Sequence, residues 1–300
     1  MNAETTNASR SRREFLQTSA AAVGVGLMLR ADIARAAHPA GSDTLKVGLV
    51  GCAGMVMAFV CWCGLAASAD DNPALPGARS PAQLKRAGYQ PLFDGKTLAG
   101  WDVKPWHIGH WVARDGVIDY DGKAKAKRFG DNTLWTKDGY GNFVLYVEWR
   151  LPAAPTMKPQ PIVLFNGDFL MQEDNPRQRA TRLGLDAGDS GILLRGVLKC
   201  QANIWSQELG SGEINGYRTD RTMPREVRRA CIPIRKADRP LGQWNVFEIT
   251  LKGESMTVVL NGQKVIDSAR LPDLPPRGPI GLQHHGDPVQ FRNIFLQPLP

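Results

Sequence analysis

Cysteine is scarce in this sequence. Only five cysteines occur among 300 residues, and Cys52, Cys61 and Cys63 lie close together near the N-terminus. Beyond residue 69 there remain Cys200 and Cys231, which allow either a single disulfide or two buried thiols. A framework of several disulfides is therefore excluded for most of the chain.

Helical periodicity is also missing after residue 90, and no nucleic-acid motif is present. Glycine (31) and proline (21) are numerous, which favours strands and turns over long helices. The net charge is +8, and much of the basic excess falls in Arg218–Lys236. Because no aromatic residues are interleaved with these charges, a solvated basic loop is favoured over a nucleic-acid-binding surface.

The first 69 residues form an export region with two signals in series. A twin-arginine pair in Ser11–Leu16 precedes an apolar run, which predicts a twin-arginine signal over residues 1–37. A second apolar segment, 47–69, carries no charge, has the length to span a bilayer and ends in the A-x-A cleavage pattern Ala67-Ser68-Ala69. Both signals predict that the rest of the chain is exported to the periplasm or the extracellular space.

Three interpretations of this prefix remain open. Leu45–Gly54 looks like the first strand and glycine turn of a dinucleotide-binding fold, and residues 1–54 resemble the leader of an exported glucose–fructose oxidoreductase-like dehydrogenase. The third glycine of the motif is missing, so no cofactor is expected. We favour a fused start, in which a second signal peptide begins at Met55. A membrane anchor and a lipoprotein site at Cys52 are the alternatives, and contact with a membrane is expected only through this segment.

After a linker over residues 70–88, residues 89–300 form one β-rich domain. Apolar and polar residues alternate strictly from Phe143 to Leu151, which is typical of a half-buried strand. Asn261-Gly262 predicts a type I′ hairpin turn. The apolar parity changes near Arg292-Asn293, which predicts a bulge or bend there. Short strands separated by turn signals indicate a β-sandwich.

Several motifs coincide in this domain. They are Pro91–Trp101, Trp111–Ile118, the Glu148 strand, Gly188–Gly196, Cys200–Trp205 and Gln283–Ile294. Together they resemble the 3-keto-disaccharide hydrolase domain family over about residues 89–298. The resemblance implies an all-β fold, a concanavalin A-like jelly roll of two antiparallel sheets, one of them concave and facing the ligand. It also implies cleavage of glycosides that are oxidised to a ketone at C3 of the sugar.

The chemistry of such a substrate indicates which side chains to seek. A C3 ketone acidifies the C2 hydrogen, so a base can remove it and the enolate can expel the C1 aglycone, with water adding afterwards. We predict His285 and Glu148 as base and acid, and Arg195 as the group that stabilises the enolate. Each has a structural alternative. His285 also fits a structural histidine beside a turn, Glu148 an ion pair on a sheet face, and Arg195 a buried ion pair.

Substrate binding is predicted for a set of polar and aromatic side chains. They are Asp189, Gln201, Asn203, Trp205, Glu213, Tyr217 and Gln283. Strand parity places Gln201, Asn203 and Trp205 on one face, and it groups His285 with Gln283 while leaving His284 in a structural role. A tryptophan of a sandwich also serves as core, and the Glu213 loop also fits a mobile surface loop.

No metal site is predicted, because His107 and His110 flank a glycine in a non-helical stretch and His284-His285 are adjacent on a strand. The expected partner is a 3-keto-glycoside or related saccharide, with a sugar 3-dehydrogenase as a functional partner and no nucleic acid. Two rival functions stay open: a non-catalytic carbohydrate-binding module on the same scaffold, and an oxidoreductase suggested by the prefix.

Overall fold

The computed structural model describes residues 75–126 and 132–300 of the chain. The chain divides into two units, Met1–Ala66 and Ala67–Pro300, and every described residue belongs to the second. The predicted twin-arginine signal, second apolar segment and dehydrogenase-like leader lie outside the described residues. Within the described ranges, no helix is both long enough and apolar enough to cross a membrane.

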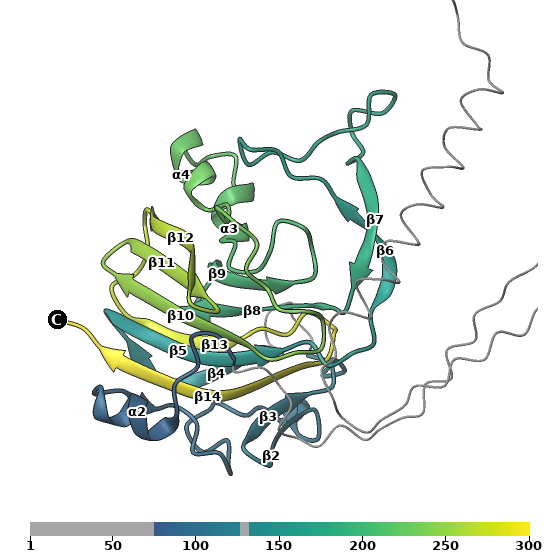
Figure 1. The fold of residues 1–300 in the computed structure, drawn as a ribbon. Helices are drawn as coiled ribbons and strands as arrows, with labels where there is room; N and C mark the ends of the chain where they lie inside the picture. The colour runs from purple at the N-terminus through teal and green to yellow at the C-terminus, as the bar shows by residue number, and fades with distance from the viewer. Residues whose placement is uncertain (1–74, 127–131) are drawn as a thin grey trace, which may run out of the picture. The chain divides into compact units, whose positions relative to one another are not determined.

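Two antiparallel sheets form the body of this domain (Figure 1). The larger sheet contains β1 (Gln90–Pro91), β2 (Trp111–Arg114), β3 (Val117–Tyr120), β5 (Phe143–Arg150), β10 (Asn245–Lys252), β11 (Ser255–Leu260), β12 (Gln263–Arg270) and β14 (Val289–Pro298). Their order is β12-β11-β10-β5-β14-β3-β2, and β1 also pairs with β14. The smaller sheet contains β4 (Leu134–Tyr140), β8 (Asp189–Leu194), β9 (Val197–Trp205) and β13 (Gly278–Leu282), in the order β4-β13-β8-β9. The predicted all-β sandwich of antiparallel sheets, a jelly roll, is confirmed.

A separate two-stranded ribbon and a few short helices complete the domain. The ribbon pairs β6 (Thr156–Pro161) with β7 (Thr181–Asp186), and the connection between them is the excursion from the sandwich. The helices are α2 (Pro81–Arg86), η1 (Pro105–His107), α3 (Asn215–Thr219) and α4 (Arg225–Ala230). The predicted linker thus contains α2, which is capped by Ser80 and buries Leu84 completely. It packs on the domain instead of running free.

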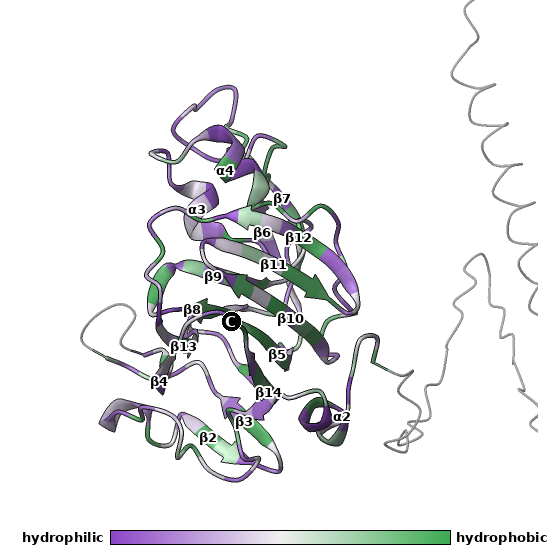
Figure 2. Cartoon of the chain, turned by 90° about the vertical axis from the view of Figure 1, so that its left-hand side faces the viewer, coloured by the Kyte–Doolittle hydropathy of each residue, from purple (hydrophilic) through white to green (hydrophobic). Residues whose placement is uncertain are grey.

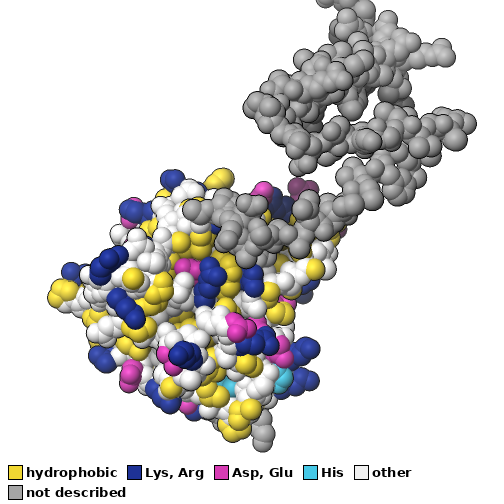
Figure 3. All heavy atoms as spheres, turned by 60° about the horizontal axis from the view of Figure 1, so that its bottom comes forward, with side chains coloured by type: hydrophobic (Ala, Val, Ile, Leu, Met, Phe, Trp, Pro, Cys, Tyr) yellow, Lys and Arg dark blue, Asp and Glu magenta, His cyan; other side chains and the backbone are white. Residues whose placement is uncertain are grey.

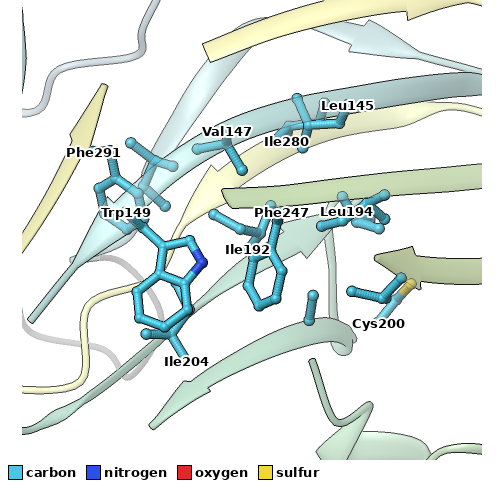
Figure 4. Close-up of a cluster of buried hydrophobic side chains, with 14 of the residues drawn as sticks. Leu145, Val147, Trp149, Ile192, Leu194, Cys200, Ile204, Phe247, Ile280 and Phe291 are labelled. Carbon is cyan, nitrogen blue, oxygen red and sulfur yellow. The ribbon is translucent and has the colours of Figure 1, made fainter. Parts of the chain in front are cut away.

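The hydrophobic core lies between the two sheets (Figure 4). Leu145, Val147 and Trp149 of β5 point toward Ile192 and Leu194 of β8, and all five side chains are at most 3% exposed. Burying each large apolar side chain contributes about 1.5–3 kcal/mol relative to exposure. The hydropathy of the residues agrees with this position of the core. Apolar residues are concentrated in strands such as β10, whereas α2 is mainly hydrophilic (Figure 2).

Two local predictions about turns are confirmed. Asn261 and Gly262 both have positive φ, 52° and 77°, and connect the paired residues Leu260 and Gln263. A type I′ turn requires positive φ at both central residues, which asparagine and glycine accept most readily. In β14 the register with β5 shifts between Arg292 and Phe295, and Asn293 has a φ of 48°. The bulge therefore lies where the apolar parity changes.

Charged side chains of both signs are interspersed with apolar ones on the face seen in Figure 3. On this face, the basic residues therefore do not form one continuous positively charged patch.

Candidate functional site

The outward face of the smaller sheet carries a row of polar side chains. Ile192, Leu194, Ala202 and Ile204 face the core, so the alternate positions of β8 and β9 face away from it. In the register of these strands Gly191 lies opposite Asn203 and Leu193 opposite Gln201. This arrangement confirms the predicted common face of the two amides.

The amide side chains on this face form a connected network. Gln201 Nε2 donates to Gln283 Oε1 at 2.8 Å and to Asn203 Oδ1 at 2.5 Å. The strand β13 continues past its last residue to bring Gln283 into place, because Gln283 N donates to Gly191 O at 2.9 Å. Asn203 Nδ2 is buried and has no hydrogen-bond partner within the described ranges. The face therefore holds a buried amide donor whose hydrogen-bonding capacity the described residues leave unsatisfied.

Gly191 creates the room in which this network forms. A Cβ at Gly191 would lie 2.2 Å from Gln201 Nε2, far inside van der Waals contact. No side chain at position 191 can coexist with Gln201 in this conformation. The glycine is thus required by the close approach of a neighbouring side chain.

Asp189 and His285 meet at one end of the amide row. Their Oδ2 and Nδ1 atoms are 3.8 Å apart, and Asp189 N donates to Asp287 Oδ2 at 3.0 Å. Burial, reinforced by the negative charges of Asp287 and Asp186, raises the pKa of Asp189 to about 7. A carboxyl group that gains and loses its proton near neutrality is suited to proton transfer.

Glu213 lies next to Asn203 on the same side of the sheet. Gly212 N donates to Asn203 O and Asn203 N donates to Glu213 O, so this segment extends β9 like a further strand. Arg218 Nε donates to Glu213 Oε1, and both side chains are fully buried. Glu213 Oε2 has no partner among the described residues. Burial outweighs the arginine and raises the pKa of Glu213 to about 7.

The Arg218 side chain also ties Glu213 to the excursion between β6 and β7. Arg218 NH1 donates to Gly167 O at 2.9 Å, and its guanidinium lies 4.6 Å from the ring centroid of Phe169. The excursion and α3 thereby lie over the end of the polar face, and α3 packs against β9 (Figure 1). These long connections exclude water from the Glu213 carboxylate.

Trp205 connects the polar row to a cavity. Its indole Nε1 donates to Gly210 O at 2.7 Å, and the residue is 7% exposed. The cavity of about 680 Å³ is lined by Trp205, the ribbon around Leu183 and the segment 236–241. Burial also raises the pKa of Asp238, which accepts two contacts from Ser211 N at 3.0 and 3.2 Å. A cavity of this size accommodates a small organic ligand such as a sugar.

Glu148, one of the predicted catalytic residues, does not lie on the face that carries Gln201. Glu148 belongs to β5 of the larger sheet, and its side chain is on the side opposite the core together with Tyr146. It accepts from Tyr146 Oη at 2.9 Å, Arg292 Nε at 2.7 Å and Asn293 Nδ2 at 3.0 Å. These contacts satisfy Glu148 as a buried ion-pair partner, which is the alternative considered for it.

Arg195, the residue predicted to stabilise the enolate, is also outside the polar row, because it lies in a turn and not on a strand. Arg195 and Gly196 have φ values of 50° and 71° and connect the paired residues Leu194 and Val197. The guanidinium donates to the carbonyl oxygens of Gly141, Gly253 and Pro275. It therefore joins three loops and is turned away from the polar row.

Tyr217, predicted to bind substrate, lies in the hydrophobic core. It is 2% exposed, its Oη donates to Pro272 O at 2.8 Å, and Lys199 Nζ lies 4.3 Å from its ring centroid. His284 has the structural role expected of it, since it contacts Tyr120 Oη and its pKa is lowered by burial. Cys200 and Cys231 are buried free thiols, which decides between the two alternatives left open for them.

The substrate-binding set predicted from the sequence includes Glu213 but not its ion-pair partner Arg218. The signal that could have revealed it is its position five residues after Glu213, across a short turn of helix. Within the described ranges no group of three or more histidine, cysteine, aspartate or glutamate side chains has the geometry to hold a metal ion.

Comparison with protein families assigns the β-sandwich domain to a class of carbohydrate-active domains. Residues 88–297 match the 3-keto-alpha-glucoside-1,2-lyase-like domain. The chain belongs to this family, as the motifs between Pro91 and Ile294 predicted. A comparison with curated protein sequences finds no similar protein.

Solved structures with similarity to the chain include two candidate glycosyl hydrolases from Parabacteroides distasonis ATCC 8503. One is 22% identical, with 71% of this chain and 84% of that chain covered and a TM-score of 0.48. Another is 18% identical, with 75% and 100% covered and a TM-score of 0.45. The carbohydrate-binding module CBM66 from Bacillus subtilis is 12% identical, with 61% and 95% covered and a TM-score of 0.34.

Proposed function

We propose that this protein cleaves 3-keto-glycosides by elimination at C1–C2 followed by hydration, with net hydrolysis of the glycosidic bond. The observation that carries the proposal is the Asp189 carboxyl group, whose pKa is raised to about 7 and which lies 3.8 Å from His285 at the end of an amide row. Membership of the 3-keto-alpha-glucoside-1,2-lyase-like family supports the substrate class.

The first step is removal of the C2 proton by the Asp189–His285 pair. The electron pair of the C2–H bond moves toward the C3 ketone, and the enolate oxygen gains negative charge. We assign the role of donor to this oxygen to Asn203 Nδ2, a buried donor without a partner in the described part of the chain. A donor that is already desolvated and oriented stabilises developing charge at little reorganisation cost.

The second step breaks the C1–O bond and releases the aglycone as an alcohol. Glu213 in its protonated form supplies the proton for the leaving oxygen, and its raised pKa keeps that form available near neutral pH. As the C1–O bond breaks, the enolate oxygen re-forms the C3 ketone and the C2 electron pair forms a new C1=C2 double bond in the product. Addition of one water molecule across this bond then gives the 3-keto sugar and completes the net hydrolysis.

The experiment is to incubate the full chain with a chromogenic 3-keto-glucoside and to follow aglycone release. The matched control substrate is the same glucoside with an unoxidised C3 hydroxyl, which lacks the acidified C2 hydrogen. Release from the ketone alone, with incorporation of solvent deuterium at C2, is the expected result. No release from the ketone together with saturable binding would favour the carbohydrate-binding module, and equal release from both substrates would exclude elimination.

We also propose that the domain acts outside the cytoplasm, supported by the twin-arginine pair at Arg12-Arg13 and the second apolar segment. Cell fractionation tests this location. A reaction that oxidises the C3 hydroxyl of a glycoside must supply the substrate, so a sugar 3-dehydrogenase is the proposed functional partner.

A further inference from the structure

An arginine-rich pocket lies outside the polar row, between the β6–β7 excursion and the helices α3 and α4. This pocket of about 270 Å³ is lined by Asp168, Phe169, Met171, Arg177, Arg179, Thr219, Arg221 and Arg228. Four guanidinium groups thus face one carboxylate, a net charge of +3 in a small volume. Like charges gathered in this way repel one another unless an anion joins them.

The backbone that carries the pocket is well ordered by its own hydrogen bonds. Leu170 N donates to Ile162 O and Ala180 N donates to Leu170 O, both at 2.8 Å, so the two arms of the excursion pair with each other. Met171 and Arg179 form a further antiparallel bridge. Arg177 and Arg179 therefore project from a built hairpin and not from an irregular loop.

Most of the positive charge in the pocket is not neutralised by the protein. Asp168 is paired with Arg228 alone, through Arg228 NH2 and Asp168 Oδ1. Within the described ranges, Arg177, Arg179 and Arg221 have no carboxylate within ion-pair distance. Arg179 instead lies over the Phe169 ring, with its guanidinium 3.8 Å from the ring centroid. Guanidinium groups bind carboxylate, sulfate and phosphate oxygens in pairs of hydrogen bonds, which suits them to fill such a pocket with an oxyanion.

The pocket is connected to the proposed catalytic face by direct contacts. Arg228 Nε donates to Arg218 O at 2.8 Å, and Arg218 is the ion-pair partner of Glu213. The Phe169 ring contacts the guanidinium groups of both Arg179, which lines the pocket, and Arg218, which pairs with Glu213, at 3.8 and 4.6 Å from its centroid. A ligand that bridges the excursion to α4 would therefore hold in place the same segment that covers Glu213.

We propose that this pocket binds an oxyanion group, a carboxylate, sulfate or phosphate ester, carried by an acidic saccharide whose sugar chain extends from the polar face. The volume matches a single charged group or one substituted sugar, since sites for larger ligands occupy about 300–1,000 Å³. The proposal rests on the proposed function for the nature of the sugar. The charge preference itself depends only on the arginines.

The test compares binding of neutral, uronate-containing and sulfated oligosaccharides of equal length to the full chain, by calorimetry at low and high salt. The acidic oligosaccharides are expected to bind at least about tenfold more tightly than the neutral one, because charge-assisted hydrogen bonds are stronger than neutral ones. Added salt should reduce this preference. Equal affinity for neutral and acidic oligosaccharides would overturn the proposal.

Two double variants separate the pocket from general positive charge. The first double variant, Arg177→Ala with Arg221→Ala, removes two exposed arginines that line the pocket. The second, Arg225→Ala with Arg229→Ala, removes two exposed arginines of α4 that do not line the pocket. The first variant should lose the preference for acidic oligosaccharides and the second should keep it. An equal loss in both would show that net charge, and not the pocket, attracts the ligand.

A third arm distinguishes a saccharide substituent from a free anion. Inorganic sulfate and phosphate should compete with the acidic oligosaccharide only weakly, because they lack the sugar contacts. If either free ion binds as tightly as the oligosaccharide, the site is for free anions and the proposal fails. Binding is measured without turnover, so absence of aglycone release would reject the proposed function and leave this result intact.

Discussion

At the scale of single residues, two carboxyl groups with raised pKa values distinguish the polar face from ordinary surface. Asp189 and Glu213 both have pKa values raised to about 7, mainly by burial. Glu148 is buried as well, but it accepts three hydrogen bonds and belongs to the other sheet. Burial alone therefore does not mark a site residue; the Glu213 carboxylate differs in that its Oε2 has no partner among the described residues.

Asp189→Asn should stabilise the protein at alkaline pH. In the folded state Asp189 keeps its proton up to about pH 7, whereas in the unfolded chain it is released near the usual value of 3.8. Stability is thus lost as pH rises from about 4 to 7, at roughly 1.4 kcal/mol per unit of pKa shift before solvent screening. The variant should melt at a higher temperature than the wild type at pH 8, with a smaller difference at pH 4.

The control for this comparison is the exposed turn residue Asp115, whose φ of 50° asparagine also accepts. Asp115→Asn should change the melting temperature by the same small amount at both pH values. A gain from Asp189→Asn that is as large at pH 4 as at pH 8 would contradict the raised pKa.

Glu213→Gln and Glu148→Gln should affect different properties. Glu213→Gln removes the proposed acid, so the rate of aglycone release should fall at least about a hundredfold. Glu148→Gln weakens the partner of Arg292 and should cost about 1–3 kcal/mol of stability while leaving the rate of release unchanged. Denaturant unfolding and steady-state kinetics measure the two effects. A large kinetic defect in Glu148→Gln would place the reaction on the larger sheet instead.

At the scale of elements, strand parity was a sound guide only within a strand. Gln201 and Asn203 share a face as predicted, since side chains alternate with a period of two residues. Extending the same rule to Arg195 would be an error, since this residue falls in a two-residue turn, where the alternation ends. The error lay in the strand boundary and not in the rule.

Gly191→Ala tests whether the amide row requires the space at this position. The added methyl group would collide with Gln201 Nε2, so Gln201 must turn away from Gln283 and Asn203. Saccharide binding should weaken about tenfold, the equivalent of roughly one lost hydrogen bond, as measured by calorimetry.

The matched glycine is Gly100, whose Cβ would meet its nearest neighbour, Leu92 O, at an ordinary 3.5 Å. Gly100→Ala should bind saccharide as the wild type does. Unchanged affinity in Gly191→Ala would mean that the amide row is not the binding surface.

At the scale of the whole molecule, the sandwich encloses both thiols of the domain. Cys200 and Cys231 are fully buried, and burial raises the pKa of each to about 12. A chain with Cys52, Cys61 and Cys63 replaced by serine should therefore have the same melting temperature with and without reductant. Its two thiols should react with a maleimide only as fast as the sandwich opens.

Rapid reaction of either thiol in the native protein would contradict this packing. A fall in melting temperature on reduction would show that a disulfide forms in solution. The Cys231→Ser variant provides the control, since it leaves Cys200 as the single thiol beyond residue 69.

The sequence by itself determined the class of fold, the family and several local features. Three local features depend only on neighbouring residues in the chain, so they can be predicted from the sequence. They are the alternation in Phe143–Leu151, the Asn261-Gly262 turn and the parity change near Arg292. The common face of Gln201 and Asn203 has the same local origin. The candidate amides, Asp189, His285 and Glu213 were proposed from the sequence, and their roles in a site stay predictions.

Only the tertiary structure decided which of these faces becomes a site. Both sheets have one face in the core, so the outward faces of β5 and β9 are equivalent to any rule based on alternation. Sheet order separates them: Glu148 meets Arg292 from a strand 144 positions later, whereas Asn203 meets Glu213 and the long connections that exclude water. Raised pKa values and unpaired donors come from burial by distant segments of chain, and no local pattern encodes that burial.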